Sequence, residues 1–110
     1  MPDRDPIPQG TLDMLVLQTL DRAEELHGFE IAESIRHHSA GVLHVEEGSL
    51  YPALQRMLLK GWIAGQWGRT EENRRARYYR LTAAGRRQLT RELEAYRRVS
   101  RAIALILTPT

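Results

Sequence analysis

The most chemically informative side chains of this sequence lie in one segment between Gly48 and Gly61. Apolar residues recur there at helical spacing, so the intervening polar residues share the opposite face. These are Ser49, Tyr51, Pro52, Gln55, Arg56 and Lys60. Glutamine and arginine can each form two hydrogen bonds to a base edge, and serine and tyrosine hydroxyls commonly hold phosphates. An ordinary amphipathic helix has a polar face too, and this segment alone favours that simpler interpretation.

A second cluster of polar residues lies around residues 68–75. It consists of Asn73, Arg74, Arg75 and Arg77. The flanking segments, Trp62–Trp67 and Ala76–Leu81, are rich in β-branched and aromatic residues and predict two strands of a hairpin. Arginines at a hairpin tip can follow a phosphate backbone or enter a narrow minor groove. A charged edge that prevents strand aggregation is the alternative, but the neighbouring polar helix favours contact with DNA.

The distribution of charge supports an anionic partner. The 110 residues have a net charge of +2, yet the two halves differ. Residues 1–61 carry 5 Lys+Arg and 10 Asp+Glu, whereas residues 62–110 carry 11 Arg and 4 Glu. Arginine is the side chain best suited to phosphate forks and groove insertion, although a solvated arginine-rich helix would show the same count.

Catalytic and metal chemistry find little support. His37, His38 and His44 have no second ligand cluster, and adjacent helical residues point about 100° apart, so we expect no metal. Cysteine is absent, and no phosphate loop, nucleophile elbow or zinc-hydrolase motif is present. The sequence therefore predicts neither an enzyme nor a cofactor. The absence of a signal peptide or a membrane-length apolar run predicts a cytoplasmic protein without a membrane partner.

The order of the predicted elements indicates how these clusters are positioned. Residues 1–9 are expected to be a disordered lead-in. Helices are predicted over 11–23, from Phe29 to about His38, and from Gly48 to Gly61, with a turn at 26–28. A hairpin and a last helix over 83–107 follow. This mainly α order with a small β-hairpin is that of a winged helix-turn-helix over 10–82, followed by a C-terminal dimerisation helix over 83–110.

The last helix has an apolar face that a small core would not cover. Its spacing is near 3.5 residues, which suits packing against another helix. The predicted dimerisation residues are Leu89, Leu93, Tyr96, Val99, Ile103, Ile106 and Leu107.

Several motifs resemble the PadR family of transcriptional regulators, over roughly residues 10–100. They are Leu26-His27-Gly28-Phe29-Glu30-Ile31-Ala32, Gly48-Ser49-Leu50-Tyr51-Pro52-Ala53-Leu54-Gln55-Arg56, Gly61-Trp62-Ile63, Asn73-Arg74-Arg75-Ala76-Arg77-Tyr78-Tyr79-Arg80-Leu81-Thr82, and Thr82-Ala83-Ala84-Gly85-Arg86. The chain is similar to the compact branch of the family, with a short C-terminal helix. The resemblance implies a dimeric repressor whose DNA contacts lie on the third helix and on the wing. Some members bind planar aromatic or phenolic compounds, often against a tryptophan, but Tyr96 stands in that position here.

Together these observations predict a sequence-specific DNA-binding repressor that acts as a homodimer on an inverted-repeat operator. Double-stranded DNA and a second copy of the chain are the expected partners, and a small-molecule effector of unknown identity stays open. The alternative is a winged-helix module that binds another protein and has no operator of its own.

Overall fold

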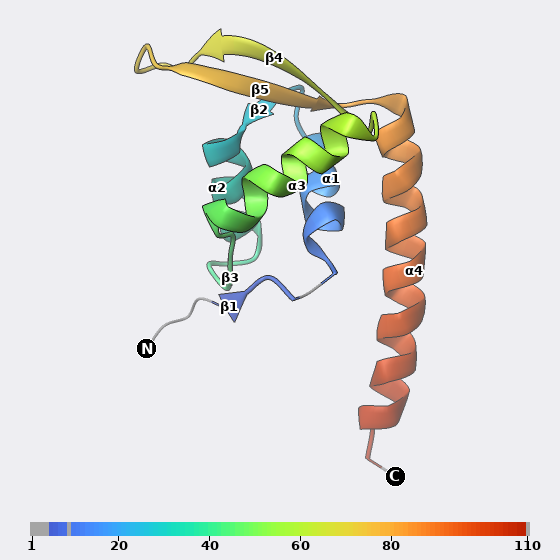
Figure 1. Cartoon of the computed structure of the whole chain (residues 1–110). Coiled ribbons are helices and arrows are strands. Elements are labelled where there is room, and N and C mark those ends of the chain that lie inside the picture. Colours follow the sequence, from blue (N-terminus) through green and yellow to red (C-terminus); the bar gives the residue numbers. More distant parts are fainter. Residues whose placement is uncertain (1–4, 9, 110) are drawn as a thin grey trace.

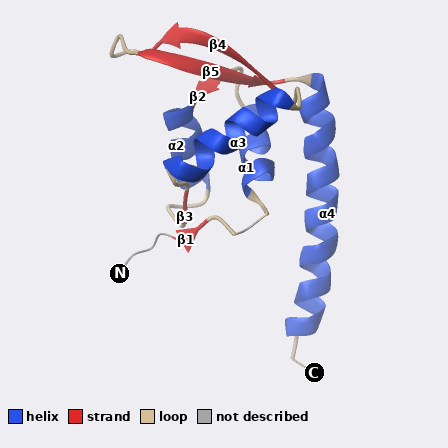
Figure 2. Cartoon of the chain, viewed as in Figure 1, coloured by secondary structure: helices blue, strands red, loops and turns tan. Residues whose placement is uncertain are grey.

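The computed structural model, which describes residues 5–8 and 10–109, has three helices, a β-hairpin and a long final helix (Figures 1 and 2). The main elements are α1 (Leu12–Asp21), α2 (Gly28–His38), α3 (Glu47–Leu59), β4 (Ile63–Arg69), β5 (Arg75–Leu81) and α4 (Ala83–Leu107). Three two-residue strands complete the fold: β1 (Asp5–Pro6), β2 (Leu26–His27) and β3 (Leu43–His44). This order confirms the predicted mainly α fold with a small hairpin.

The core lies between the three short helices and is closed by the hairpin. Each helix contributes apolar residues from one face, as helical periodicity predicts. Leu17 of α1, Ile31 of α2 and Leu54 of α3 are all fully buried. Ile63 and Leu81, which pair at the base of the hairpin, extend the same cluster. This packing fixes the direction in which α3 and the hairpin project.

The sheet has three strands, in the order β2-β5-β4, and all its pairings are antiparallel. Leu26–His27, predicted as a turn, pairs with Tyr78 and Tyr79 of β5 instead. Two residues carry too little alternation to signal a strand, so this pairing depends on tertiary contacts. The hairpin is also longer than predicted, because Arg69 pairs with Arg75 at its end.

The N-terminal segment differs from the disordered lead-in that the sequence predicts. Asp5–Pro6 runs parallel to Leu43–His44, and Ile7 packs against the core. Residues 1–4 and 9 of the predicted lead-in lie outside the described part of the chain.

Helix α4 begins against the hairpin. The Thr82 hydroxyl accepts a hydrogen bond from the Gly85 amide at 3.0 Å, which caps the helix. Leu89, predicted as a dimerisation residue, is instead buried in the chain's own core, and Leu93 is half-buried against it. The prediction of a free apolar face is therefore wrong for Leu89, because the first turns of α4 pack on α1.

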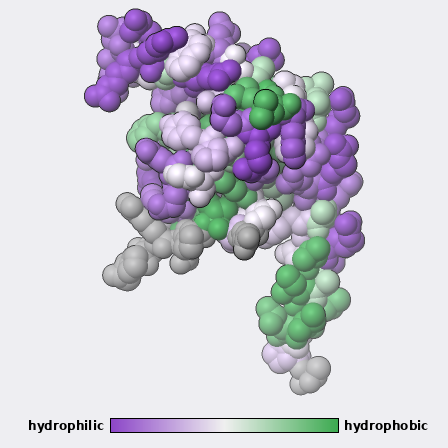
Figure 3. Space-filling model, viewed as in Figure 1, coloured by the Kyte–Doolittle hydropathy of each residue, from purple (hydrophilic) through white to green (hydrophobic). Residues whose placement is uncertain are grey.

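The second half of α4 extends away from the rest of the chain (Figure 1). Its large apolar side chains are between 49% and 82% exposed: Tyr96, Val99, Ile103, Leu105, Ile106 and Leu107. Figure 3 shows a hydrophobic patch near the C-terminal end of this helix. Among the described residues, no helix is long and apolar enough to cross a membrane.

Candidate nucleic-acid interface

Helix α3 presents the polar face that its sequence predicts. Leu50, Ala53, Leu54 and Met57 are buried. The six predicted contact residues on the other face are all exposed: Ser49, Tyr51, Pro52, Gln55, Arg56 and Lys60. The structure confirms their exposure, and their contacts with DNA stay predictions.

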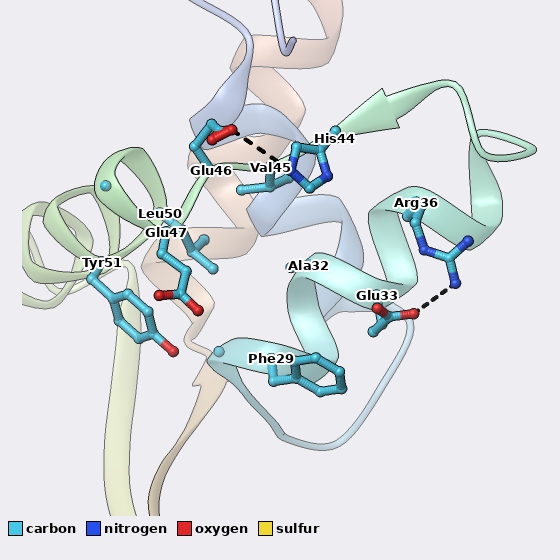
Figure 4. Close-up of a pocket in the computed structure, with 12 residues that line it drawn as sticks. Phe29, Ala32, Glu33, Arg36, His44, Val45, Glu46, Glu47, Leu50 and Tyr51 are labelled. Carbon is cyan, nitrogen blue, oxygen red and sulfur yellow. Dashed lines mark hydrogen bonds and ion pairs between the residues drawn. The ribbon is translucent and has the colours of Figure 1, made fainter. Parts of the chain in front are cut away.

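Tyr51 reaches from α3 toward the start of α2 (Figure 4). A Cβ atom added to Gly28 would lie 2.6 Å from the Tyr51 hydroxyl oxygen, so glycine lets the tyrosine ring lie close to the α2 backbone. The ring is held from one side and 45% of the residue stays exposed. A hydroxyl placed this way can donate to a phosphate oxygen.

Two cations, Arg56 in α3 and Lys60 directly after it, already have partners within the chain. The Arg56 guanidinium donates to the Asp13 carboxylate of α1 at 2.7 Å. The Lys60 ammonium lies 4.7 Å from the centre of the Trp62 ring. Neither residue borders the groove between α3 and the hairpin, which Tyr51 and Gln55 line from the α3 side. Of the predicted residues, Tyr51 and Gln55 therefore line this groove, whereas Arg56 and Lys60 do not.

The hairpin forms the other wall of that groove, whose volume is about 1030 Å³. Arg74, Arg75 and Arg77 line it, and Phe29 of α2 lies at its edge. Among the described residues, none of these three guanidinium groups has a hydrogen-bond or ion-pair partner. The structure thus brings all three predicted wing arginines to the same groove as Tyr51 and Gln55, and leaves their charge available to an anion.

Asn73 has a structural role at the hairpin tip. Its φ of +61° is a left-handed conformation that asparagine tolerates better than most residues. The backbone amide of Asn73 donates to the Thr70 carbonyl at 2.9 Å. The backbone carbonyl of Asn73 accepts a hydrogen bond from the Arg69 guanidinium at 3.1 Å. These bonds shape the turn, and a DNA contact by the Asn73 side chain stays a prediction.

Sequence reasoning missed Trp67 and Arg69 as parts of this surface. Both lie on β4, on the same side of the sheet as Arg75 and Arg77. Strand alternation could have identified them, since residues two apart share a face. Trp67 is 56% exposed, so its ring is available at this surface.

The N-terminal end of α3 is acidic. Glu33, Glu46 and Glu47 line a separate pocket between α2 and the start of α3, where His44 lies 3.6 Å from Glu46 (Figure 4). No group of three potential metal ligands occurs among the described residues. Glu30, Glu71 and Glu72 line the groove beside the hairpin as well, and there Arg74, Arg75 and Arg77 supply the cations that attract a phosphate.

Comparison with known proteins gives one consistent family. The transcriptional regulator PadR-like family matches residues 16–91. The transcriptional regulator Rv3488 of Mycobacterium tuberculosis is 32% identical over 79 residues, which are 72% of this chain and 70% of the relative. A transcriptional regulator structure from Clostridium thermocellum has a TM-score of 0.82 at 27% identity and covers 91% of this chain and 96% of its own. A PadR family regulator from Clostridium difficile has a TM-score of 0.75 at 28% identity, covering 90% and 100%.

Proposed function

Because this chain belongs to the PadR family of transcriptional regulators, we propose that it represses transcription as a homodimer bound to an inverted-repeat operator. Regulators of this family act through DNA binding and are not enzymes. Repression, dimerisation and the operator are the proposed parts. The observation that best supports binding to DNA is the groove in which Tyr51 and Gln55 of α3 face Arg74, Arg75 and Arg77 of the hairpin.

The two walls of the groove have different proposed roles. Gln55 lies on the exposed face of α3 and can bond an adenine edge with two hydrogen bonds, so it would contribute to sequence specificity. Arg74 and Arg75 lie at the hairpin tip, where they would meet phosphates or the minor groove. Arg56 would read a base only after exchanging the Asp13 carboxylate for DNA.

Dimerisation is proposed from the exposed apolar half of α4. A two-fold dimer would present two copies of α3, so the operator would be an inverted repeat with half-site centres about 10 base pairs apart, or a multiple of that spacing. DNase footprinting on duplexes selected by the wild-type protein from a random library tests this. A single asymmetric half-site at saturating protein would contradict it.

The DNA contacts are tested by fluorescence anisotropy with the selected operator and a scrambled duplex over a salt series. Arg75→Ala should weaken binding to both duplexes and reduce the salt slope by about 0.9. Gln55→Ala should cost about 1–3 kcal/mol on the operator and much less on scrambled DNA. Arg91→Ala is the matched control, because Arg91 lies exposed on α4, where it bonds Gln88 at 2.9 Å.

The same titration separates this proposal from the interaction-module alternative. A wild-type protein that selects no sequence and binds duplex no better than the Arg75→Ala protein would support a winged helix that binds another protein. Repression itself is tested with a reporter placed behind the selected operator. Expression that does not fall when the protein is supplied would contradict the repressor role.

A further inference from the structure

The hairpin carries one continuous face that starts in the core and ends at the tip. Side chains alternate along a strand, so residues two apart share a face. Ile63 and Tyr79 are buried on this face near its base. Farther out, Gly65 and Trp67 follow on β4, and Trp67 lies directly opposite Arg77 on β5. The outer part of this face, beyond the core, therefore carries Trp67 with arginines beside it.

Trp67 contacts two arginine side chains. The guanidinium carbon of Arg75 lies 4.3 Å from the centre of the Trp67 ring, and that of Arg77 lies 5.9 Å from it. A guanidinium within about 6 Å of an aromatic centre is attracted by the ring's electron density. Trp67 is therefore held at the surface by contacts with cations rather than by burial.

Gly65 provides the space in which Arg77 lies. A Cβ atom at position 65 would be 2.6 Å from the Arg77 Nε atom and 3.2 Å from its guanidinium carbon. The Arg77 Nε atom is buried and has no hydrogen-bond partner among the described residues. The guanidinium thus lies across the bare backbone of β4, at the cost of one unsatisfied donor. Packing of this kind restrains a side chain that would otherwise be highly mobile.

We propose that Trp67 and Gly65 are positioning residues that hold Arg75 and Arg77 ready for the DNA backbone before DNA arrives. This inference rests on the proposed DNA-binding function. A free arginine loses much rotamer freedom when it binds, and one already held in place loses less. Trp67 and Gly65 therefore raise the affinity for DNA without adding a phosphate contact.

The salt series distinguishes positioning from direct contact. Trp67→Leu should weaken binding to every duplex by about 3- to 10-fold, because the freed arginine side chains would then have to be ordered on binding. The salt slope should stay at the wild-type value, because the same phosphates are still neutralised. Trp67→Phe should restore most of the affinity, and Gly65→Ala should weaken binding by displacing Arg77. Gln66→Ala is the matched control, because Gln66 is exposed on the opposite face of β4.

A measurement on the free protein keeps this inference separate from the proposed function. The Trp67 ring should shift the NMR signals of the Arg75 side-chain protons upfield. That shift should disappear in Trp67→Leu while the signals of core residues stay in place. Wild-type affinity in Trp67→Leu, a reduced salt slope in that variant, or unshifted Arg75 protons in the wild-type protein would each overturn the proposal. If the wild-type protein bound no DNA but showed the shift, the contact between Trp67 and Arg75 would be confirmed and the proposed DNA-binding function would be contradicted.

Discussion

Gly85 lies where α4 meets the hairpin, and replacing it with alanine should destabilise the chain strongly. The added Cβ would clash with the Trp62 carbonyl oxygen and lie 2.8 Å from the Leu81 Cδ1 atom. That oxygen also accepts hydrogen bonds from the Thr82 amide at 3.1 Å and the Thr82 hydroxyl at 2.9 Å. The clash is with backbone, which cannot move aside as a flexible side chain could.

The magnitude follows from three opposing effects. Overpacking of a rigid site costs about 1–3 kcal/mol, and each disturbed hydrogen bond adds about 0.5–1.5 kcal/mol. The better helix propensity of alanine returns about 1 kcal/mol. With two hydrogen bonds disturbed, the free energy of unfolding should therefore fall by about 1–5 kcal/mol, from a total of about 5–15 kcal/mol for a chain of this length.

Urea denaturation followed by circular dichroism measures this change, with Gly48→Ala as the matched control. Gly48 lies in α3, and a Cβ there would meet no atom within 4 Å. That substitution should stabilise the chain slightly, by less than the roughly 0.5–1 kcal/mol that glycine costs in a helix interior, because Gly48 is the second residue of α3. If Gly85→Ala matched the control in sign and size, the packing of α4 on the hairpin described above would be refuted.

Three further predictions concern the surface and the core. Asp13→Asn should raise the affinity for operator and scrambled duplexes about 2- to 5-fold in anisotropy titrations. The reason is that it releases Arg56 from an exposed ion pair worth about 0.2–1 kcal/mol. Weaker binding would instead show that Asp13 orients Arg56. Replacing both Ile103 and Leu107 with glutamate should give monomers in sedimentation velocity, because burial of such a side chain contributes about 1.5–3 kcal/mol, and an intact dimer would contradict the role of α4. Burial raises the pKa of Tyr79, so the folded state favours the neutral phenol, and stability should decline as pH rises above 10.0, the ordinary value. Urea denaturation of Tyr79→Phe should show a smaller decline, and an unchanged one would exclude Tyr79 as its source.

Local signals in the sequence predicted the elements well where those signals were strong. Helix α4 spans the predicted 83–107, because Thr82 is a good capping residue and the apolar periodicity is long. The outward face of α3 was predicted from apolar spacing alone. Strand β2 was not predicted, since its pairing with β5 joins residues about 50 positions apart and leaves no local pattern.

Periodicity also could not tell which partner covers an apolar face. Leu89 and Ile103 have the same place in the α4 pattern, yet Leu89 is 4% exposed and Ile103 is 49% exposed. The difference arises because the body of the fold, and α1 in particular, reaches only the first turns of α4. A sequence gives the direction of a face, whereas the length of the neighbouring element decides where the core stops.

The contacts of Trp67 and Gly65 with Arg75 and Arg77 were not predicted, for a similar reason. Trp67 continues the alternating face of Ile63 and Gly65, so the sequence pattern assigns all three to one side of the hairpin. Nothing local marks Gly65 as the residue at which buried packing ends and the exposed arginine contacts begin. That boundary is tertiary, because α3 packs on the base of the hairpin and leaves its outer part uncovered. A large apolar residue beyond such a boundary gains little from burial, and its value lies in the side chains that it holds in place.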